Sequence, residues 1–524
     1  MQQAINNILV EDAIQVYELL LKQNTEIPAE LKQSLLELLA FYNGAQAVGE
    51  DSVEQRYFSD KNVKKTHWVQ DCLAEKIFVD LKDGPDANKA YSAMIAGLCA
   101  HNKVIRAYEF YCEALEKSLT LTIEAFNGII SVSGSIKERA DLNWELIQDV
   151  LKTMASSNIQ PNADTLNAVL SVLVGYNQFL GRSYADHILA EFKQLGVEPT
   201  LASWHYVLLM NYYDNDTKTD YNKMAQILKE VECKPIVIQS VVDSDFFVTA
   251  MSVCLRHSLD QNVVHQIHRM VSGNPSQQLL ISGTKHQRYY RTLLSALSLC
   301  SDIDEYMKVH ESIVPSLYLV DAMTLTNVLR AIDVSGAIQH ISRIWSDIYV
   351  LNLTYHDILM RQLVTTMIKN PPVEGIKEQE FMSETYASIA TDIIIMLKDA
   401  VGGSYYNRQL QAEQYGELIV LLGKNNNHAQ ILDAFISVVD NKVNVKGDLL
   451  FGPLQQVIQS CKSEKSPNTA LRVIEYAVQK GVENHLKLAK LTLESFTLSE
   501  NHYQRLEQLI GANTVKALLE SSVD

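Results

Sequence analysis

The sequence contains few residues that interrupt helices. Its 524 residues include 11 prolines and 21 glycines. Leucine, alanine, isoleucine, lysine and glutamate are common, and these residue types favour helices. A length of 524 residues fits three or four globular domains by the usual size range, or one long repeat protein. The scarcity of helix breakers therefore favours a largely helical chain.

Cysteine and long apolar runs are also scarce. The sequence has seven cysteines, an odd number, and no CxxC motif. Both observations favour buried free thiols in a reducing compartment over a framework of disulfide bonds. His265 and His268 form an HxxH pair without nearby cysteine or an HExxH context, so we expect no metal site. The longest apolar run, near Ile393–Met396, is far too short to span a bilayer, so we expect no membrane contact.

Positive charge is the third deficit. There are 45 Lys and Arg residues against 62 Asp and Glu residues, a net charge of −17. Nucleic-acid binders are usually basic because phosphate neutralisation supplies much of their affinity. The balance argues against strong unaided RNA binding by the whole surface, but permits a local basic strip or binding helped by partner proteins. The first 20 residues contain Glu11 and Asp12, so we expect no visible transit peptide.

Motifs for catalysis are missing. The sequence has no GxxxxGK[ST], GxGxxG, GxSxG or HExxH pattern. Asp243 and Asp245 are close together, and we interpret them as helix N-caps. We therefore expect neither an enzyme nor a cofactor or small-molecule substrate.

What the sequence does contain is a repeated apolar stripe. Ala107, Phe110, Tyr111 and Ala114 are spaced at offsets 0, 3, 4 and 7, which is one face of a helix. The same stripe begins again at Ile147, Ala185 and Met224, and further copies begin at Ala13, Ala74, Tyr306, Ile341, Ile431 and Ala470. Steps of 38 to 40 residues between the first four copies indicate stacked helical hairpins.

A first helix precedes each of the better stripes, and short turns with Gly or Pro separate the hairpins. We predict an all-α superhelical solenoid of about ten degenerate hairpins. The expected divisions are degenerate hairpins over 1–86, the best repeats over 87–245, degenerate central repeats over 246–370, an irregular connector over 371–411 and further helical repeats over 412–524. Pro371-Pro372 marks the best break and Gly402-Gly403 a second.

Two helices per unit, an aromatic-Asn start and a G-x-x-P-[DNT] turn resemble the pentatricopeptide repeat. The run AYSAMIAGLCAHNKVIRAYEFYCEAL is close to that pattern, and the Trp-x-x-Leu-Gly-x-x-Tyr signature of tetratricopeptide repeats is absent. From about 70 to 490, the chain looks like the pentatricopeptide proteins of the mitochondrial small ribosomal subunit. That resemblance implies the mitochondrial matrix, contact with small-subunit rRNA and ribosomal proteins, and a place near the messenger entry side.

Members of this family read bases with a polar residue early in the first helix and the last residue of the unit. The resemblance implies five such RNA-binding pairs, Ser92 with Thr122, Asn127 with Asn162, Asn167 with Thr200, Arg291 with Asp321 and Thr326 with His356. Asn127 and Asn162 are most like the family pattern, whereas bulky His205 and Arg291 depart from it. The competing interpretation is that these Asn and Ser side chains are helix caps or solvated residues.

Lys285, Arg288 and Arg291 surround Tyr289 and Tyr290 in the densest basic-aromatic run, which could contact phosphates and stack on bases. Tyr290 also fits as a core aromatic of its repeat. A weaker cluster comprises Lys61, Lys64, Lys65 and Trp68.

We expect an RNA-contacting structural subunit of the mitochondrial small ribosomal subunit that supports translation, with mRNA as a further possible ligand. Two other functions stay open. One is an organellar RNA processing or stability factor that binds single-stranded RNA unaided, and the other is a protein scaffold without RNA.

Overall fold

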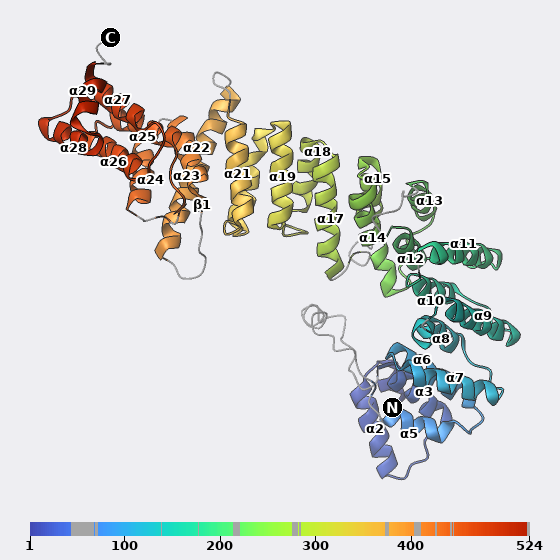
Figure 1. Cartoon of the computed structure of the whole chain (residues 1–524). Helices are drawn as coiled ribbons and strands as arrows, with labels where there is room; N and C mark the ends of the chain where they lie inside the picture. Colours follow the sequence, from blue (N-terminus) through green and yellow to red (C-terminus); the bar gives the residue numbers. More distant parts are fainter. Residues whose placement is uncertain are drawn as a thin grey trace. The chain divides into compact units, whose positions relative to one another are not determined.

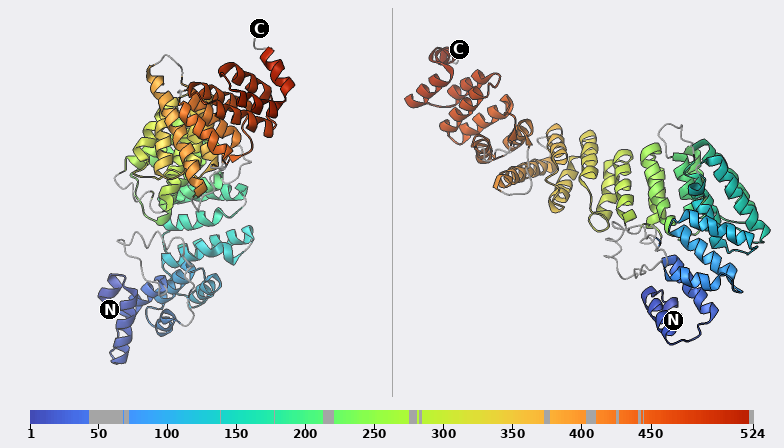
Figure 2. Two further views of the ribbon diagram at one scale, coloured as in Figure 1. Left: turned by 90° about the vertical axis from the view of Figure 1, so that its left-hand side faces the viewer. Right: turned by 60° about the horizontal axis from the view of Figure 1, so that its bottom comes forward.

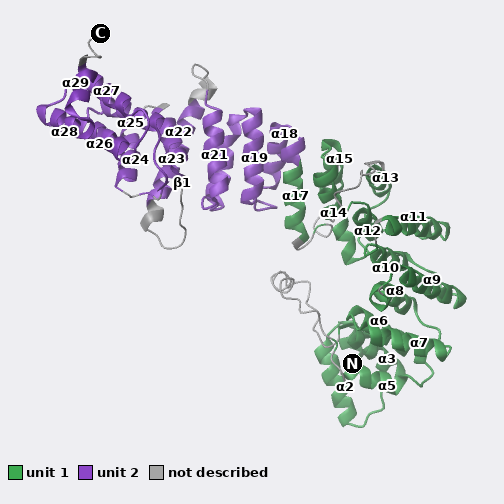
Figure 3. Cartoon of the chain, in the orientation of Figure 1, with its two compact units in different colours: residues 1–296 green, residues 297–524 purple. Residues whose placement is uncertain are grey.

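The computed structural model describes residues 1–42, 68, 72–137, 139–176, 178–212, 221–274, 281, 284–372, 377–402, 410–424, 427–440, 443 and 445–520. Most of these residues lie in helices (Figure 1). They form two compact units, residues 1–296 and 297–524 (Figure 3). The predicted all-α class is confirmed.

The first unit begins with a short helix and continues as helical hairpins. Its helices are α1 (Gln2–Asn6), α2 (Val10–Lys22), α3 (Ala29–Tyr42), α5 (Leu73–Leu81), α6 (Ala87–Ala100), α7 (Val104–Glu116), α8 (Ile123–Ile136), α9 (Ala140–Ser156), α10 (Ala163–Leu173), α11 (Gln178–Gln194), α12 (Leu201–Tyr212), α13 (Tyr221–Glu232), η1 (Val241–Ser244), α14 (Asp245–Val253), η2 (Cys254–Ser258) and α15 (Gln261–Ser272). Helix α17 (Thr284–Cys300) begins in this unit.

The second unit repeats the same plan. Its helices are α18 (Ile303–Ile313), α19 (Ala322–Ser335), η3 (Ile338–His340), α20 (Ile341–Val350), α21 (Asp357–Lys369), α22 (Lys377–Gly402), α23 (Ala412–Lys424), α24 (His428–Val439), α25 (Phe451–Ser463), α26 (Pro467–Gln479), α27 (His485–Ser495), α28 (Glu500–Ile510) and α29 (Ala512–Glu520). Two-residue strands β1 (Leu410–Gln411) and β2 (Val445–Lys446) pair in parallel.

Within each unit, the first helices of successive hairpins pack on one another. Contacts run from α3 to α6, α8, α10, α12 and α14 in the first unit, and from α19 to α21, α23, α25 and α27 in the second. Figure 2 shows the hairpins of both units in two further orientations. Because each helix contacts the hairpins before and after it, the stability of each hairpin depends on its neighbours.

The predicted stripes form the core between hairpins. Ala107, Tyr111 and Ala114 on α7 are buried, and so are the matching positions on α11 and α13. On α9, Ile147, Val150 and Met154 are buried, whereas Leu151 is only partly buried. Aromatic rings fill the space between α5, α6 and α7, with Phe78 lying 5.0 Å from Tyr91 and 5.1 Å from Phe110 between ring centroids. The stripes therefore predicted the second helices and the side that each of them buries.

Gly97 allows α6 to approach α3 closely. A Cβ atom at this position would lie 2.5 Å from the backbone oxygen of Ala40 and 2.8 Å from its Cβ atom. We expect Gly97→Ala to lower the free energy of unfolding of the first unit by about 1–3 kcal/mol, because two helix backbones must move apart. Thermal unfolding followed by circular dichroism measures this. Gly452→Ala, where no atom lies within 4 Å of the added Cβ, is the control. Equal melting temperatures for the two variants would contradict this packing.

The structure departs from the expected organisation between residues 371 and 411. This stretch was expected to be an irregular connector, but α22 occupies residues 377–402 within it. Met382, Tyr386 and Ile393 are buried, so the stretch contributes a helix with an apolar face. The double proline at 371–372 suggested a longer break than the structure has. Lys61, Lys64, Lys65 and Gly403 lie outside the described residues.

Candidate nucleic-acid interface

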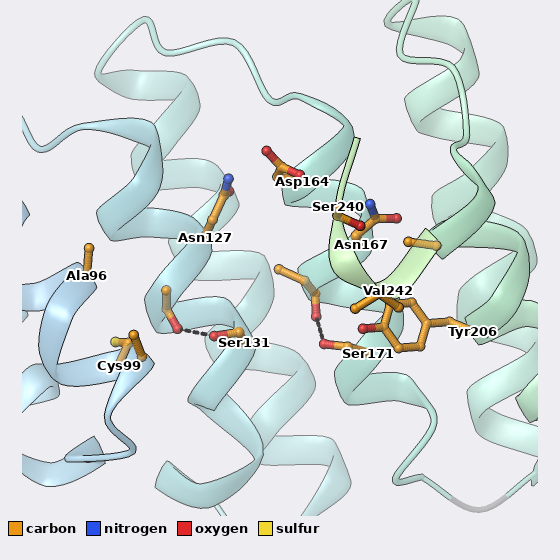
Figure 4. A pocket seen from close by; sticks show the side chains of 14 residues that line it. Ala96, Cys99, Asn127, Ser131, Asp164, Asn167, Ser171, Tyr206, Ser240 and Val242 are labelled. Carbon is orange, nitrogen blue, oxygen red and sulfur yellow. Dashed lines mark hydrogen bonds between the residues drawn. The ribbon is translucent and has the colours of Figure 1, made fainter. Parts of the chain in front are cut away.

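A groove of about 360 Å³ crosses the first helices of the best repeats. It extends over α6, α8, α10 and α12 and reaches the segment around Ser240 and Val242 (Figure 4). Asn127 and Asn167, the first residues of two predicted base-reading pairs, both line it. The sequence pattern thus placed two polar side chains in one continuous depression.

Small side chains make this face hollow. Ala96, Gly128, Ala168 and Ala202 contribute to the lining, and α6 and α8 pack tightly beneath it. A Cβ atom on Gly128 would lie 3.2 Å from the Cβ atom of Cys99. Helix backbone and small side chains therefore form the floor of the groove, and the larger side chains of Asn127 and Asn167 project from it (Figure 4).

Asn127 is held by the following hairpin. Its Oδ1 atom accepts a hydrogen bond from the Thr165 hydroxyl at 2.7 Å, and its Nδ2 atom donates to Asn162 Oδ1 at 3.4 Å. Asn162 also caps α10, because its Oδ1 atom accepts from the Thr165 backbone N–H at 2.9 Å. The pair is therefore in contact, and Asn162 is a helix cap as well. An amide N–H donor on Asn127 remains to meet a ligand.

Asn167 repeats this arrangement one hairpin later. Its Nδ2 atom donates to Thr200 Oγ1 at 3.1 Å, and its Oδ1 atom accepts from the Ser203 hydroxyl at 2.6 Å. In both repeats, a hydroxyl at the third position of the next helix engages the amide oxygen. The side chains of Asn127 and Asn167 are consequently fixed before any ligand arrives, which lowers the entropy cost of binding.

Ser92 and Thr122 are also in contact, but in a different way. The Ser92 hydroxyl accepts from the Thr122 backbone N–H at 2.9 Å and donates to the Asn88 carbonyl at 2.7 Å. Ser92 is buried and does not line the groove. Its hydroxyl joins α6 to the start of α8, so this pair has a structural use.

The segment around Asp243 forms one end of the groove. The buried Asp243 carboxylate accepts from the backbone N–H groups of Ala202 at 2.7 Å, Gln239 at 2.8 Å and Ser240 at 2.6 Å. It therefore satisfies N–H groups at the start of α12 and in the turn before η1. The expected N-cap positions were wrong, because Ser240 precedes η1 and Asp243 is its third residue, while Asp245 is the first residue of α14. Ser240 directly precedes η1, as Asn162 precedes α10, and its spacing of 40 residues from Thr200 could have pointed to this lining position.

His205 and Tyr206 lie near the same end. His205 Nδ1 is 2.9 Å from the Thr249 hydroxyl, and burial lowers the pKa of its ring. Burial also raises the pKa of Tyr206, which lines the groove. Both side chains are therefore neutral at pH 7 and offer hydrogen bonds without charge.

The groove lacks the basic strip that the overall charge left possible. Among the described residues that line it, Asp164 is the only charged one. Phosphate groups gain no ion pair from these lining residues, so the groove is better suited to base edges than to the backbone of a nucleic acid.

Most side chains of the basic-aromatic run on α17 make contacts within the protein. Lys285 Nζ lies 2.9 Å from Asp245 Oδ2, 2.9 Å from the Val241 carbonyl and 2.7 Å from Ser244 Oγ. Tyr289 and Tyr290 are almost completely buried, which supports the core interpretation of Tyr290. Arg288 and Arg291 are exposed. Lys285 instead anchors the turn that carries Asp243.

The remaining predicted residues lie in the second unit. Asp321 caps α19 by accepting from the Thr324 backbone N–H at 2.8 Å. The buried Thr326 hydroxyl donates to the Ala322 carbonyl at 2.6 Å, whereas the His356 ring packs on Tyr355 with centroids 4.2 Å apart. Each of these residues thus has a local contact of its own. Arg291 belongs to the first unit and its predicted partner Asp321 to the second.

Comparison with known sequences identifies the relatives of this chain. Residues 1–103 match the family model "Small ribosomal subunit protein mS39, PPR". A protein of Drosophila melanogaster named small ribosomal subunit protein mS39 is 29% identical over 514 residues, which cover 97% of this chain and 78% of the relative. The Danio rerio protein of the same name is 27% identical over 521 residues, covering 95% and 76%. This chain is therefore similar to mS39 proteins over nearly its whole length. The resemblance to pentatricopeptide proteins of the small ribosomal subunit is thereby confirmed for nearly the whole chain.

Two solved structures of one pentatricopeptide repeat protein are similar to this chain. The pentatricopeptide repeat protein PPR10 from maize matches with a TM-score of 0.35 and 13% identity, covering 99% of this chain and 72% of PPR10. PPR10 in complex with an 18-nt psaJ RNA element matches with a TM-score of 0.34 and 13% identity, covering 94% and 62%.

Two structural findings concern metal ions and membranes. Within the described part of the chain, no group of three or more His, Cys, Asp or Glu residues is arranged to hold a metal ion. No described helix is long and apolar enough to cross a membrane.

Proposed function

We propose that this protein is a structural subunit of the mitochondrial small ribosomal subunit that contacts RNA and supports translation. The observation that carries the proposal is the 29% identity to Drosophila mS39 over 97% of the chain. The proposed role is non-enzymatic, and the proposed location is the mitochondrial matrix. The proposed partners are small-subunit rRNA, neighbouring ribosomal proteins and mRNA.

The groove on α8 and α10 is the proposed RNA contact. The fixed amides of Asn127 and Asn167 offer hydrogen bonds to base edges, and the small floor residues allow a base to approach the helices. Because the lining includes no cation, affinity for the phosphate backbone must come from another surface or from neighbouring molecules. A subunit held in a large assembly satisfies that need through its neighbours, whereas a factor that binds RNA alone would need a separate basic surface of its own.

Gradient sedimentation of a tagged protein from detergent-lysed mitochondria tests this function. The proposal predicts a peak that coincides with the small ribosomal subunit. A peak confined to light fractions and insensitive to RNase would favour the scaffold function. A nuclease-sensitive peak away from ribosomes, together with tight binding to a short single strand, would favour the RNA processing or stability factor.

Loss of both groove amides is expected to weaken the RNA contact. We expect Asn127→Ala combined with Asn167→Ala to reduce RNA crosslinking of the groove at least about fivefold, because two lost hydrogen bonds of roughly 0.5–1.5 kcal/mol each weaken binding by roughly 1–3 kcal/mol. Ultraviolet crosslinking of assembled small subunits measures the yield. Asn327→Ala on α19, outside the groove, is the matched control. An unchanged yield in the double variant with normal assembly would remove Asn127 and Asn167 from the interface.

A further inference from the structure

A second groove lies on the second helices of the first unit. It has a volume of about 570 Å³ and is lined by residues of α9 and α11, including Trp144, Gln148, Leu151, Tyr184 and Glu191. The Asn127 groove lies instead on the first helices. This second surface is therefore separate from the proposed RNA contact.

A stacked aromatic pair lines this groove. The rings of Trp144 and Tyr184 stack with centroids 4.3 Å apart and planes 3° apart, and both residues are only partly buried. Phe179, one turn before Ser183 on α11, is 83% exposed. Partly exposed Trp and Tyr side chains in a concavity are typical of the residues that dominate protein interfaces, and Phe179 adds exposed apolar surface outside the lining residues.

The surroundings of the groove are acidic. Helices α9 and α11 carry five carboxylates and three Lys or Arg residues. Lys152 pairs with Asp149, Lys193 pairs with Glu230, and the Arg182 guanidinium donates to the carbonyls of Met210 and Asn211. The cations of these helices are thus already engaged.

Two carboxylates remain available for a partner. Glu145 lies one residue after Trp144 and has no ion pair within the described residues, and Glu191 lies in the groove itself. Glu191 Oε1 lies 3.4 Å from Nδ1 of His187, which also lines the groove. This contact is an ion pair only when His187 is protonated. A cationic partner would complete the charge balance here.

We propose that the α9–α11 groove docks an arginine-containing basic segment of a second protein. A guanidinium stacks on indole and phenol faces and pairs with carboxylates, which matches the aromatic pair and the two glutamates. RNA is a poorer occupant because its phosphates would meet Glu145, Glu191 and the acidic helices. The inference goes beyond the proposed RNA contact and does not depend on it.

Site-specific photocrosslinking in cells tests this docking surface. Benzoylphenylalanine is placed at Ser183, which is exposed in the groove, and at Glu109, which is exposed on α7. We expect a nuclease-resistant protein adduct at Ser183 that exceeds the one at Glu109. The crosslinked peptide, identified by mass spectrometry, should carry arginine and net positive charge.

Charge reversal supplies the second readout. Glu145→Lys combined with Glu191→Lys is expected to lower the Ser183 adduct about tenfold, whereas Glu109→Lys combined with Glu116→Lys should change it less than about twofold. Circular dichroism confirms that both exposed pairs leave the fold intact. A nuclease-sensitive adduct, an acidic crosslinked peptide, no adduct above the Glu109 position, or equal yields in both double variants would each overturn the proposal.

Discussion

Asp243→Ala is expected to lower the free energy of unfolding of the first unit by about 3 kcal/mol. The buried carboxylate accepts three backbone N–H groups, from α12 and from the turn before η1. Charge-assisted hydrogen bonds of this kind contribute roughly 1.5–3 kcal/mol when one is removed singly, but bonds that share one acceptor are not additive, so the expected loss is smaller than their sum. Urea unfolding followed by circular dichroism measures the loss. Hydrogen exchange should also rise in α12 and α14.

Two variants separate this capping role from a general loss of charge. Asp243→Asn keeps an acceptor oxygen and should lie between the wild type and the alanine variant. Asp245→Ala removes a neighbouring carboxylate whose contact with Lys285 is partly exposed, and should cost under about 1 kcal/mol. If Asp243→Ala were no more destabilising than Asp245→Ala, the proposed attachment of the groove end to α12 would be wrong.

The second large effect is expected in the second unit, at the buried pair of His310 and Asp347. His310 Nε2 lies 2.8 Å from Asp347 Oδ2, and His310 Nδ1 lies 3.2 Å from the Tyr306 hydroxyl. Burial raises the pKa of Tyr306 well above its usual value, so this phenol stays neutral. Asp347 Oδ1 lies 3.4 Å from Arg343 Nη2. The pair joins α18 to α20, the second helices of consecutive hairpins.

Asp347→Leu should destabilise the second unit by about 3 kcal/mol, because it leaves the buried His310 ring without its carboxylate and removes a contact of the half-buried Arg343. His310→Leu combined with Asp347→Leu should be less destabilising than the sum of the single variants, with a coupling of about 1–3 kcal/mol. Thermal and urea unfolding of the four proteins give the coupling. Strictly additive effects would contradict a direct interaction.

A surface pair of the same residue types provides the matched control. His340 Nε2 lies 2.6 Å from Asp304 Oδ1, and Asp304 is exposed to solvent. The same double-mutant cycle at His340 and Asp304 should give little coupling, because water screens exposed pairs. A coupling at this surface pair as large as that of the buried pair would mean that burial is not the cause.

The sequence predicted the second helices well because their signal is local. Four apolar residues at offsets 0, 3, 4 and 7 define one helix face whatever the intervening loop does. The Asn127–Asn162 and Asn167–Thr200 contacts were also within reach, since adjacent hairpins bring together residues separated by one repeat length. Contacts between residues that are one repeat length apart in the sequence can therefore be predicted from that spacing.

Other features depended on partners that spacing does not reveal. Lys285 was expected to be a phosphate contact, but Asp245, Val241 and Ser244 lie about 40 residues earlier and engage its ammonium group. The helix α22 was missed because a double proline outweighed its weaker apolar face. The Trp144–Tyr184 stack could have been noticed, since the two residues lie 40 positions apart in the same stripe-bearing helices.

The central claim is that the α8–α10 groove contacts RNA within the small ribosomal subunit. Ultraviolet crosslinking of the purified small subunit, with the crosslinked peptides identified by mass spectrometry, tests this claim most directly. The predicted result is nucleotide adducts on peptides that contain Asn127 or Asn167. Adducts confined to other parts of the chain, or none at all from a protein that sediments with the small subunit, would contradict it.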